Sequence, residues 1–108
     1  MKLVFQEFEE IEAVYLFGSM AAGMVRAASD IDLAIYPGKV SLRQNKIDIL
    51  QKLAQKGFCN VDLVFLTDDD IVLQYEAVRL NTIVYQRPDF DSGAHFSIII
   101  RKYLDFLP

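Results

Sequence analysis

The sequence predicts an α/β (α+β) fold in which helices pack on a small mixed β-sheet. Short apolar runs rich in β-branched and aromatic residues recur at 13–17, 30–35, 60–66 and 82–86, and each has the length of a strand. The segments between and after these runs place apolar residues at helical spacing. The length suits a single domain, residues 1–108, with one hydrophobic core and no separate substrate domain.

The first third of the chain is expected to run from helix to strand to turn. Residues 2–12 have apolar side chains at helical spacing and predict a short amphipathic helix before the strand at 13–17. The Ala-rich stretch 20–28 favours one helical turn with Ser19 as its N-cap. The second strand ends at the turn 36–38, which reads Tyr-Pro-Gly.

The middle of the chain predicts a helical crossover to a third strand. A capping-box pattern at 41–44 begins a helix that runs to Gly57, a natural left-handed terminator. This helix leads to the strand at 60–66. Its expected apolar stripe is Ile47, Leu50, Leu53 and Ala54.

The last third predicts helix, edge strand and helix. The acidic run 68–70 precedes a helix at 71–78, where capping is a better interpretation than metal binding. Residues 82–86 predict a short edge strand. The final helix, 91–107, either docks a partner or a second copy of the chain, or lies in its own core. We expect His95 at its start to be a surface or cap residue, and the stripe of this helix to be Phe96, Ile99, Ile100, Tyr103 and Leu104.

Two acids in the second strand are the strongest functional signal. Asp30 and Asp32 are two residues apart, so they share one face of the strand while apolar residues occupy the other. Ionised carboxylates in an apolar strand are costly unless they are paired, and two of them at one edge suit a divalent metal ion. The ordinary alternative is a solvated pair at a frayed strand start, or a turn cap.

A second signal follows the first strand, which ends at Gly18-Ser19. A strand that leads through glycine into a helix start presents free N–H groups to an anion, so this turn is a candidate phosphate site. A plain strand-to-helix turn is the alternative interpretation.

The spacing of these motifs resembles a known signature. Gly18-Ser19, then ten residues, then Asp30 and Asp32 resembles the nucleotidyltransferase superfamily that includes DNA polymerase beta, and in particular the minimal nucleotidyltransferases (MNT proteins). The resemblance implies a polymerase beta-like nucleotidyltransferase fold with a third carboxylate on a neighbouring strand, a position that Asp62 supplies. Within 60–66 apolar residues alternate with Asp62, so Asp62 faces away from the more apolar row.

One departure from the family pattern concerns a basic residue. Ala22 stands where the family commonly has arginine, and Arg26 is the basic residue nearby. Two interpretations stay open: Arg26 substitutes for the missing arginine, or the basic contact to the triphosphate is lost.

The resemblance implies nucleotidyl transfer from ATP with Mg²⁺. Asp30 and Asp32 would hold Mg²⁺ ions about 3.5–4 Å apart. Asp62 would complete the shell of the second ion and accept the proton of the attacking hydroxyl. Gly18 and Ser19 would bind the phosphates that leave as pyrophosphate.

The resemblance also implies a partner. MNT proteins of this size typically stand beside a HEPN toxin, which implies an antitoxin that moves AMP from ATP onto a toxin tyrosine. Two alternatives remain open: an antitoxin that only binds and masks its HEPN partner, and a small-molecule nucleotidyltransferase of the aminoglycoside-modifying type.

Composition narrows the setting of this chemistry. The net charge of −4 provides no broad basic field for an extended nucleic acid. Cys59 is the only cysteine, so neither a disulfide nor a cysteine-rich zinc site is available, which fits a reducing cytoplasm. We expect no signal peptide and no membrane segment.

Overall fold

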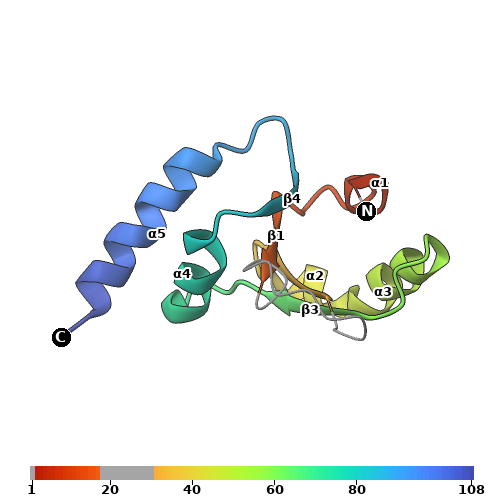
Figure 1. The fold of residues 1–108 in the computed structure, drawn as a ribbon, viewed down its shortest axis with the longest axis horizontal. Coiled ribbons are helices and arrows are strands. Elements are labelled where there is room, and N and C mark those ends of the chain that lie inside the picture. Colours follow the sequence, from red (N-terminus) through yellow and green to blue (C-terminus); the bar gives the residue numbers. More distant parts are fainter. Residues whose placement is uncertain (1, 18–30) are drawn as a thin grey trace.

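The computed structural model describes residues 2–17 and 31–108, which form one four-stranded sheet with helices on both faces (Figure 1). The elements in chain order are α1 (Lys2–Gln6), β1 (Ala13–Phe17), β2 (Ile31–Tyr36), α2 (Val40–Gln44), α3 (Lys46–Gln55), β3 (Val61–Phe65), α4 (Ile71–Arg79), β4 (Ile83–Gln86) and α5 (Ser92–Phe106). Within these described ranges, no helix is both long and apolar enough to cross a bilayer.

The sheet is mixed, as expected from the sequence. Its strand order is β3-β2-β1-β4. β1 pairs antiparallel with β2 and β4, whereas β2 and β3 are parallel. A parallel pair needs a crossover connection, which α2 and α3 provide. The predicted edge position of the strand at 82–86 is confirmed, because β4 has β1 as its only neighbour in this order.

Apolar residues fill both sides of the sheet. Figure 1 shows α1 and α3 on one side and α4 and α5 on the other. The α1–α3 side contains Val4, Phe5, Ile11, Val14, Leu33, Ile35, Leu42, Ile49, Leu53, Leu63 and Tyr85. The α4–α5 side contains Ala13, Tyr15, Ala34, Leu66, Ala77, Val78 and Ile99. Consecutive residues such as Leu33 and Ala34 thus enter opposite layers, as strand alternation requires.

The acids that precede α4 and α5 are helix caps. The Asp70 side chain accepts a hydrogen bond of 3.1 Å from the backbone N–H of Leu73. Asp91 accepts one of 3.0 Å from the backbone N–H of Ala94. Both satisfy a donor that the first turn of a helix leaves free, so the capping interpretation of the acidic run is confirmed at Asp70.

The helix predicted over residues 2–12 is too long. α1 ends at Gln6, and residues 7–12 turn toward the sheet. There the backbone N–H of Glu12 donates to the backbone carbonyl of Tyr36, and the Glu12 carbonyl accepts from the backbone N–H of Arg87, both at 2.9 Å. Sheet pairing therefore overrides the helical periodicity, while Ile11 remains fully buried in the turn.

The single helix predicted up to Gly57 is two helices. Asn45, with φ −94° and ψ 9°, separates α2 from α3. The predicted capping box is wrong, because Lys39 is the N-cap of α2 and the Ser41 hydroxyl donates to Glu10 instead. Gly57 has φ 96°, which confirms the left-handed end.

The break also changes which face of α3 is buried. Ile49 and Leu53 are fully buried, while Ile47 is 70% exposed and Ala54 is exposed. The predicted stripe is therefore wrong at two of its four positions, because the helix begins at Lys46 and is turned relative to α2.

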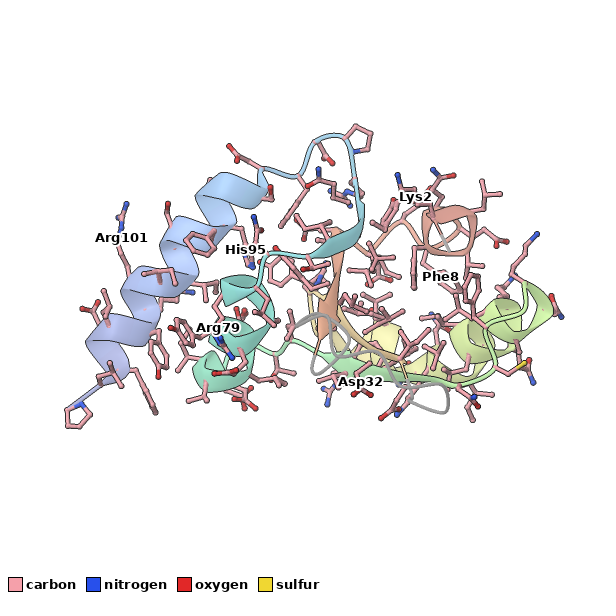
Figure 2. All side chains as sticks on the ribbon, in the orientation of Figure 1. Lys2, Phe8, Asp32, Arg79, His95 and Arg101 are labelled. Carbon is pink, nitrogen blue, oxygen red and sulfur yellow. The ribbon has the colours of Figure 1, made fainter. Side chains whose placement is uncertain are left out.

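His95 is buried, contrary to the expectation of a surface or cap position. It is 8% exposed and packs between α5 and the sheet (Figure 2). Its ring centroid is 4.3 Å from that of Tyr36, 5.4 Å from that of Phe90 and 6.4 Å from that of Tyr15. His95 lies four residues before the buried Ile99, a helical spacing that indicates the same face.

The buried imidazole predicts a loss of stability in mild acid. Burial, with a smaller contribution from Lys102, lowers the pKa of His95 below its usual value, against a weaker opposing effect of Asp68. The folded state therefore favours neutral His95. Its contribution to the free energy of unfolding is present in full above about pH 6.5 and is lost as the pH falls below that value. Urea unfolding between pH 7.5 and 5.5 should show it.

The control for this prediction is His95→Phe, which keeps an aromatic ring in the cluster without a titrating group. We expect the variant to lose this part of the pH dependence. Equal pH dependence of the two proteins over this range would contradict the assignment.

Gly38 lies too close to the backbone at Leu66 and Thr67, just after β3, for any side chain. A Cβ at this position would lie 2.7 Å from the Leu66 carbonyl carbon and 2.7 Å from the Thr67 nitrogen, both backbone atoms. Gly38→Ala should lower the free energy of unfolding by about 1–3 kcal/mol. Gly93→Ala is the matched control. The added Cβ would have ordinary space within a helix, so this variant should raise the free energy of unfolding by up to about 1 kcal/mol. Thermal unfolding of both variants measures the difference.

Candidate functional site

The structure brings together two of the three predicted acids. Asp32 on β2 and Asp62 on β3 are direct partners in the parallel register. Adjacent strands are about 4.8 Å apart, and partners in register project from the same face. The two carboxylates are therefore neighbours on one face of the sheet, near the start of both strands. Figure 2 labels Asp32 at this position.

The local sequence explains this placement. Ile31, Leu33 and Ile35 belong to the apolar layer on the α1–α3 side, so alternation sends Asp32 to the α4–α5 side. The backbone N–H of Ile31 donates to the Asn60 carbonyl at 2.8 Å and holds the two strand starts together. A slip of one residue would move every apolar side chain to the other face, so the hydrophobic layers specify the register that pairs the acids.

The other predicted site residues lie outside the described residues. These are Gly18, Ser19 and Asp30, together with Ala22 and Arg26. The described residues next to them in the chain, Phe17 and Ile31, are both neighbours of Asp32. Phe17 is the register partner of Asp32, and Ile31 directly precedes Asp32 in the sequence. The predicted roles of Gly18, Ser19 and Asp30 stay predictions.

A lysine that the sequence analysis missed reaches the acid pair. The Lys46 Nζ atom lies 3.5 Å from the Asp62 Oδ1 atom. The apolar residues of α3 pack in the layer on the opposite face from Asp62, so the long Lys46 side chain reaches from that layer to an acid on the other face. Sequence offered no signal for this contact, because it depends on the helix break at Asn45 that makes Lys46 the first residue of α3.

The donors fit a hard divalent cation. Asp32 and Asp62 supply carboxylate oxygens, the ligands that Mg²⁺ prefers. The ammonium group beside Asp62 also shows that a cation is accommodated there. Within residues 2–17 and 31–108, no three acidic, histidine or cysteine side chains gather as a metal site. A third carboxylate would have to come from elsewhere, and Asp30 is the predicted one.

A hollow of about 420 Å³ at the other end of β2 does not belong to this site. Glu12, Tyr36 and Asp68 are among the residues that line it. Burial, followed by the charges of Glu12 and Asp68, raises the pKa of Tyr36 above its ordinary value. Tyr36 ends β2 whereas Asp32 lies near its start, so the two sets of groups are separated by the length of the strand.

Comparison with known families agrees with this geometry. The family model described as polymerase beta, nucleotidyltransferase matches residues 1–90. This chain belongs to the polymerase beta nucleotidyltransferase family. The family match covers both strands that carry Asp32 and Asp62.

A curated relative within this nucleotidyltransferase family is the protein adenylyltransferase MntA of Shewanella oneidensis. The two are 32% identical over 78 residues, which cover 72% of this chain and 56% of the relative. The match therefore spans little more than half the length of that protein.

Solved structures show the same nucleotidyltransferase fold. A toxin–antitoxin crystal structure with AMP-PNP has a TM-score of 0.72 and 25% identity, and the match covers 97% of this chain and 84% of that one. A complex of the tri-AMPylated HEPN toxin of Shewanella oneidensis with its MNT antitoxin has a TM-score of 0.63 and 23% identity, with coverage of 97% and 81%. The expected polymerase beta-like fold is confirmed.

The pairing of two like charges predicts that the site costs stability. Carboxylates directly opposite each other repel, so Asp32→Asn should raise the free energy of unfolding by about 0.2–1 kcal/mol. Asp62→Asn should raise the free energy of unfolding by less, since this substitution also removes the ion pair with Lys46. Urea denaturation at low ionic strength without divalent metal ions measures both. A less stable Asp32→Asn protein would contradict the electrostatic argument.

Proposed function

We propose that this chain transfers AMP from ATP to a tyrosine hydroxyl of a HEPN-type toxin and thereby acts as its antitoxin. The register pairing of Asp32 with Asp62 carries the proposal, because it builds an acidic site in a chain of the nucleotidyltransferase family. The relative named protein adenylyltransferase and the toxin–antitoxin complex with an ATP analogue support the reaction type and the class of partner.

The reaction forms one bond and breaks one. The acceptor oxygen attacks the α-phosphorus of ATP, the bond from that phosphorus to the bridging oxygen breaks, and pyrophosphate leaves. Such transfers depend on positioning and charge neutralisation more than on covalent help from the protein. When bound, Mg²⁺ supplies the positive charge that neutralises the phosphates.

Each site residue has a task in this scheme. Asp30, Asp32 and Asp62 would hold the metal ions, and the backbone at Gly18 with the Ser19 hydroxyl would bind the departing phosphates. The Asp62 side chain is 61% exposed, so a hydroxyl group of another molecule can approach it. We assign to Asp62 the uptake of the acceptor proton, directly or through water.

The partner and setting follow from the same scheme. The acceptor hydroxyl would come from a second protein presented at the open face beside Asp62. ATP is abundant in the cytoplasm, and the lone Cys59 is compatible with a reducing compartment, so we place the reaction there.

The decisive experiment uses ATP labelled at the α-phosphate. This chain would be incubated with Mg²⁺, the labelled ATP and a purified HEPN-type toxin. We expect AMP on a toxin tyrosine, located by mass spectrometry. Asp30→Asn, Asp32→Asn and Asp62→Asn should each lower the rate by about 10²–10³-fold, since each removes charge at the reacting phosphate. Asp48→Asn, at an exposed acid on α3, is the control.

Two other outcomes would replace the proposal. Inhibition of the toxin without ATP, unaffected by the aspartate variants, would indicate an antitoxin that only masks its partner; Ala22 in place of the usual arginine is the observation that favours this alternative. Label transferred to an aminoglycoside in a parallel incubation, with none on the toxin, would indicate a small-molecule nucleotidyltransferase.

A further inference from the structure

Lys46 is the one basic side chain that forms an ion pair with the acid pair among the described residues. Its Nζ atom is 3.5 Å from Asp62 Oδ1, and its side chain is 43% exposed. In the order across the sheet, β1 lies on one side of Asp32, and β3, which carries Asp62 and its contact with Lys46, lies on the other. The lysine therefore stands at the outer limit of the site.

Both contacts to the Asp62 carboxylate fall on the same oxygen. Oδ1 accepts a hydrogen bond of 2.9 Å from the backbone N–H of Leu63 and faces the Lys46 ammonium. Among the described residues, no hydrogen bond is made to Oδ2. The backbone bond fixes the direction of the carboxylate, and the ammonium occupies one of its cation positions.

We propose that Lys46 is a positioning residue that acts as a resident counter-cation, which a divalent metal ion must displace from Asp62. The inference rests on the proposed function, since it assumes that Asp32 and Asp62 bind that metal ion. Before metal binding, the ammonium offsets the repulsion between the two carboxylates and keeps Asp62 in place. On metal binding, the ammonium leaves Oδ1, which its exposed and flexible side chain permits.

The positive charge of Lys46 determines how much this residue weakens metal binding. A single positive charge beside the Asp62 carboxylate would oppose the binding of a divalent ion there, and solvent and salt screen this repulsion at an exposed site. Removing the charge should therefore strengthen metal binding about threefold to tenfold. Replacement by arginine keeps the charge and should restore the affinity of the unaltered protein.

The chain offers a matched control on the same helix. Lys52 on α3 pairs with Glu7 at 3.2 Å, and its side chain is 34% exposed, close to the value for Lys46. Lys52→Gln removes the same charge and one exposed ion pair, but at Glu7, just after α1, instead of at the acids. Any effect of net charge or of a lost surface pair would appear equally in both variants.

The test measures Mn²⁺ binding to the nucleotide-free protein by electron paramagnetic resonance of the free ion. The proteins are the unaltered chain, Lys46→Gln, Lys46→Arg, Lys52→Gln and Asp32→Asn. We expect the dissociation constant to fall about threefold to tenfold in Lys46→Gln, to stay unchanged in Lys46→Arg and Lys52→Gln, and to rise strongly in Asp32→Asn. Circular dichroism of each variant verifies that it is folded.

The possible failures are distinguishable. If Mn²⁺ binding depends on Asp32 but Lys46→Gln leaves it unchanged or weakens it, the counter-cation role is overturned and the proposed function stands. If no variant binds Mn²⁺ and the unaltered chain transfers no AMP, both proposals are overturned. An equal gain in Mn²⁺ affinity in Lys46→Gln and Lys52→Gln would show that net charge alone causes it, and would also overturn the role of Lys46.

Discussion

The parallel register of β2 and β3 is the constraint on which the site depends. These strands are joined by α2 and α3, which pack on one face of the sheet and leave the acids on the other. Apolar packing sets the faces: Ile31, Leu33 and Ile35 enter one layer, so Asp32 lies on the opposite face, and the parallel register with β3 then places it beside Asp62. The favourable burial on one face thus offsets the repulsion on the other.

The crossover has a second effect at the site. Because the helical segment breaks at Asn45, α3 starts at Lys46 at the edge of the sheet. Among the described strands β3 has β2 as its one neighbour, and the Lys46 side chain of α3 reaches Asp62 on this strand. The charge balance of the site therefore depends on strand order as well as on strand register.

Much of the fold could be predicted from local patterns, and the errors occurred where tertiary contacts overrode them. The bounds of β1 and the capping role of Asp70 follow from residue type and spacing, and they are observed. The helix expected over 2–12 stops early because Glu12 pairs with the sheet, a contact invisible in the local sequence. The position of His95 at the start of the last helix predicts a surface or cap residue, whereas its spacing from the buried Ile99 indicates the burial that is observed.

The same distinction holds for the site. Alternation within each strand predicted the outward direction of Asp32 and Asp62, and their direct pairing needed only the crossover. Lys46 could not be predicted in this way, because its position results from a helix break and a strand order together.

All residues assigned here to the chemistry fall between positions 18 and 62, whereas α4, β4 and α5 come later in the chain and supply none of them. Helix α5 nonetheless exposes Ile98, Leu104 and Phe106, at 49%, 61% and 59%. The exposed apolar side chains of α5 thus lie in a part of the chain that carries none of the assigned reacting groups. A substitution on this surface of the last third would change its apolar character and leave every assigned reacting group in place.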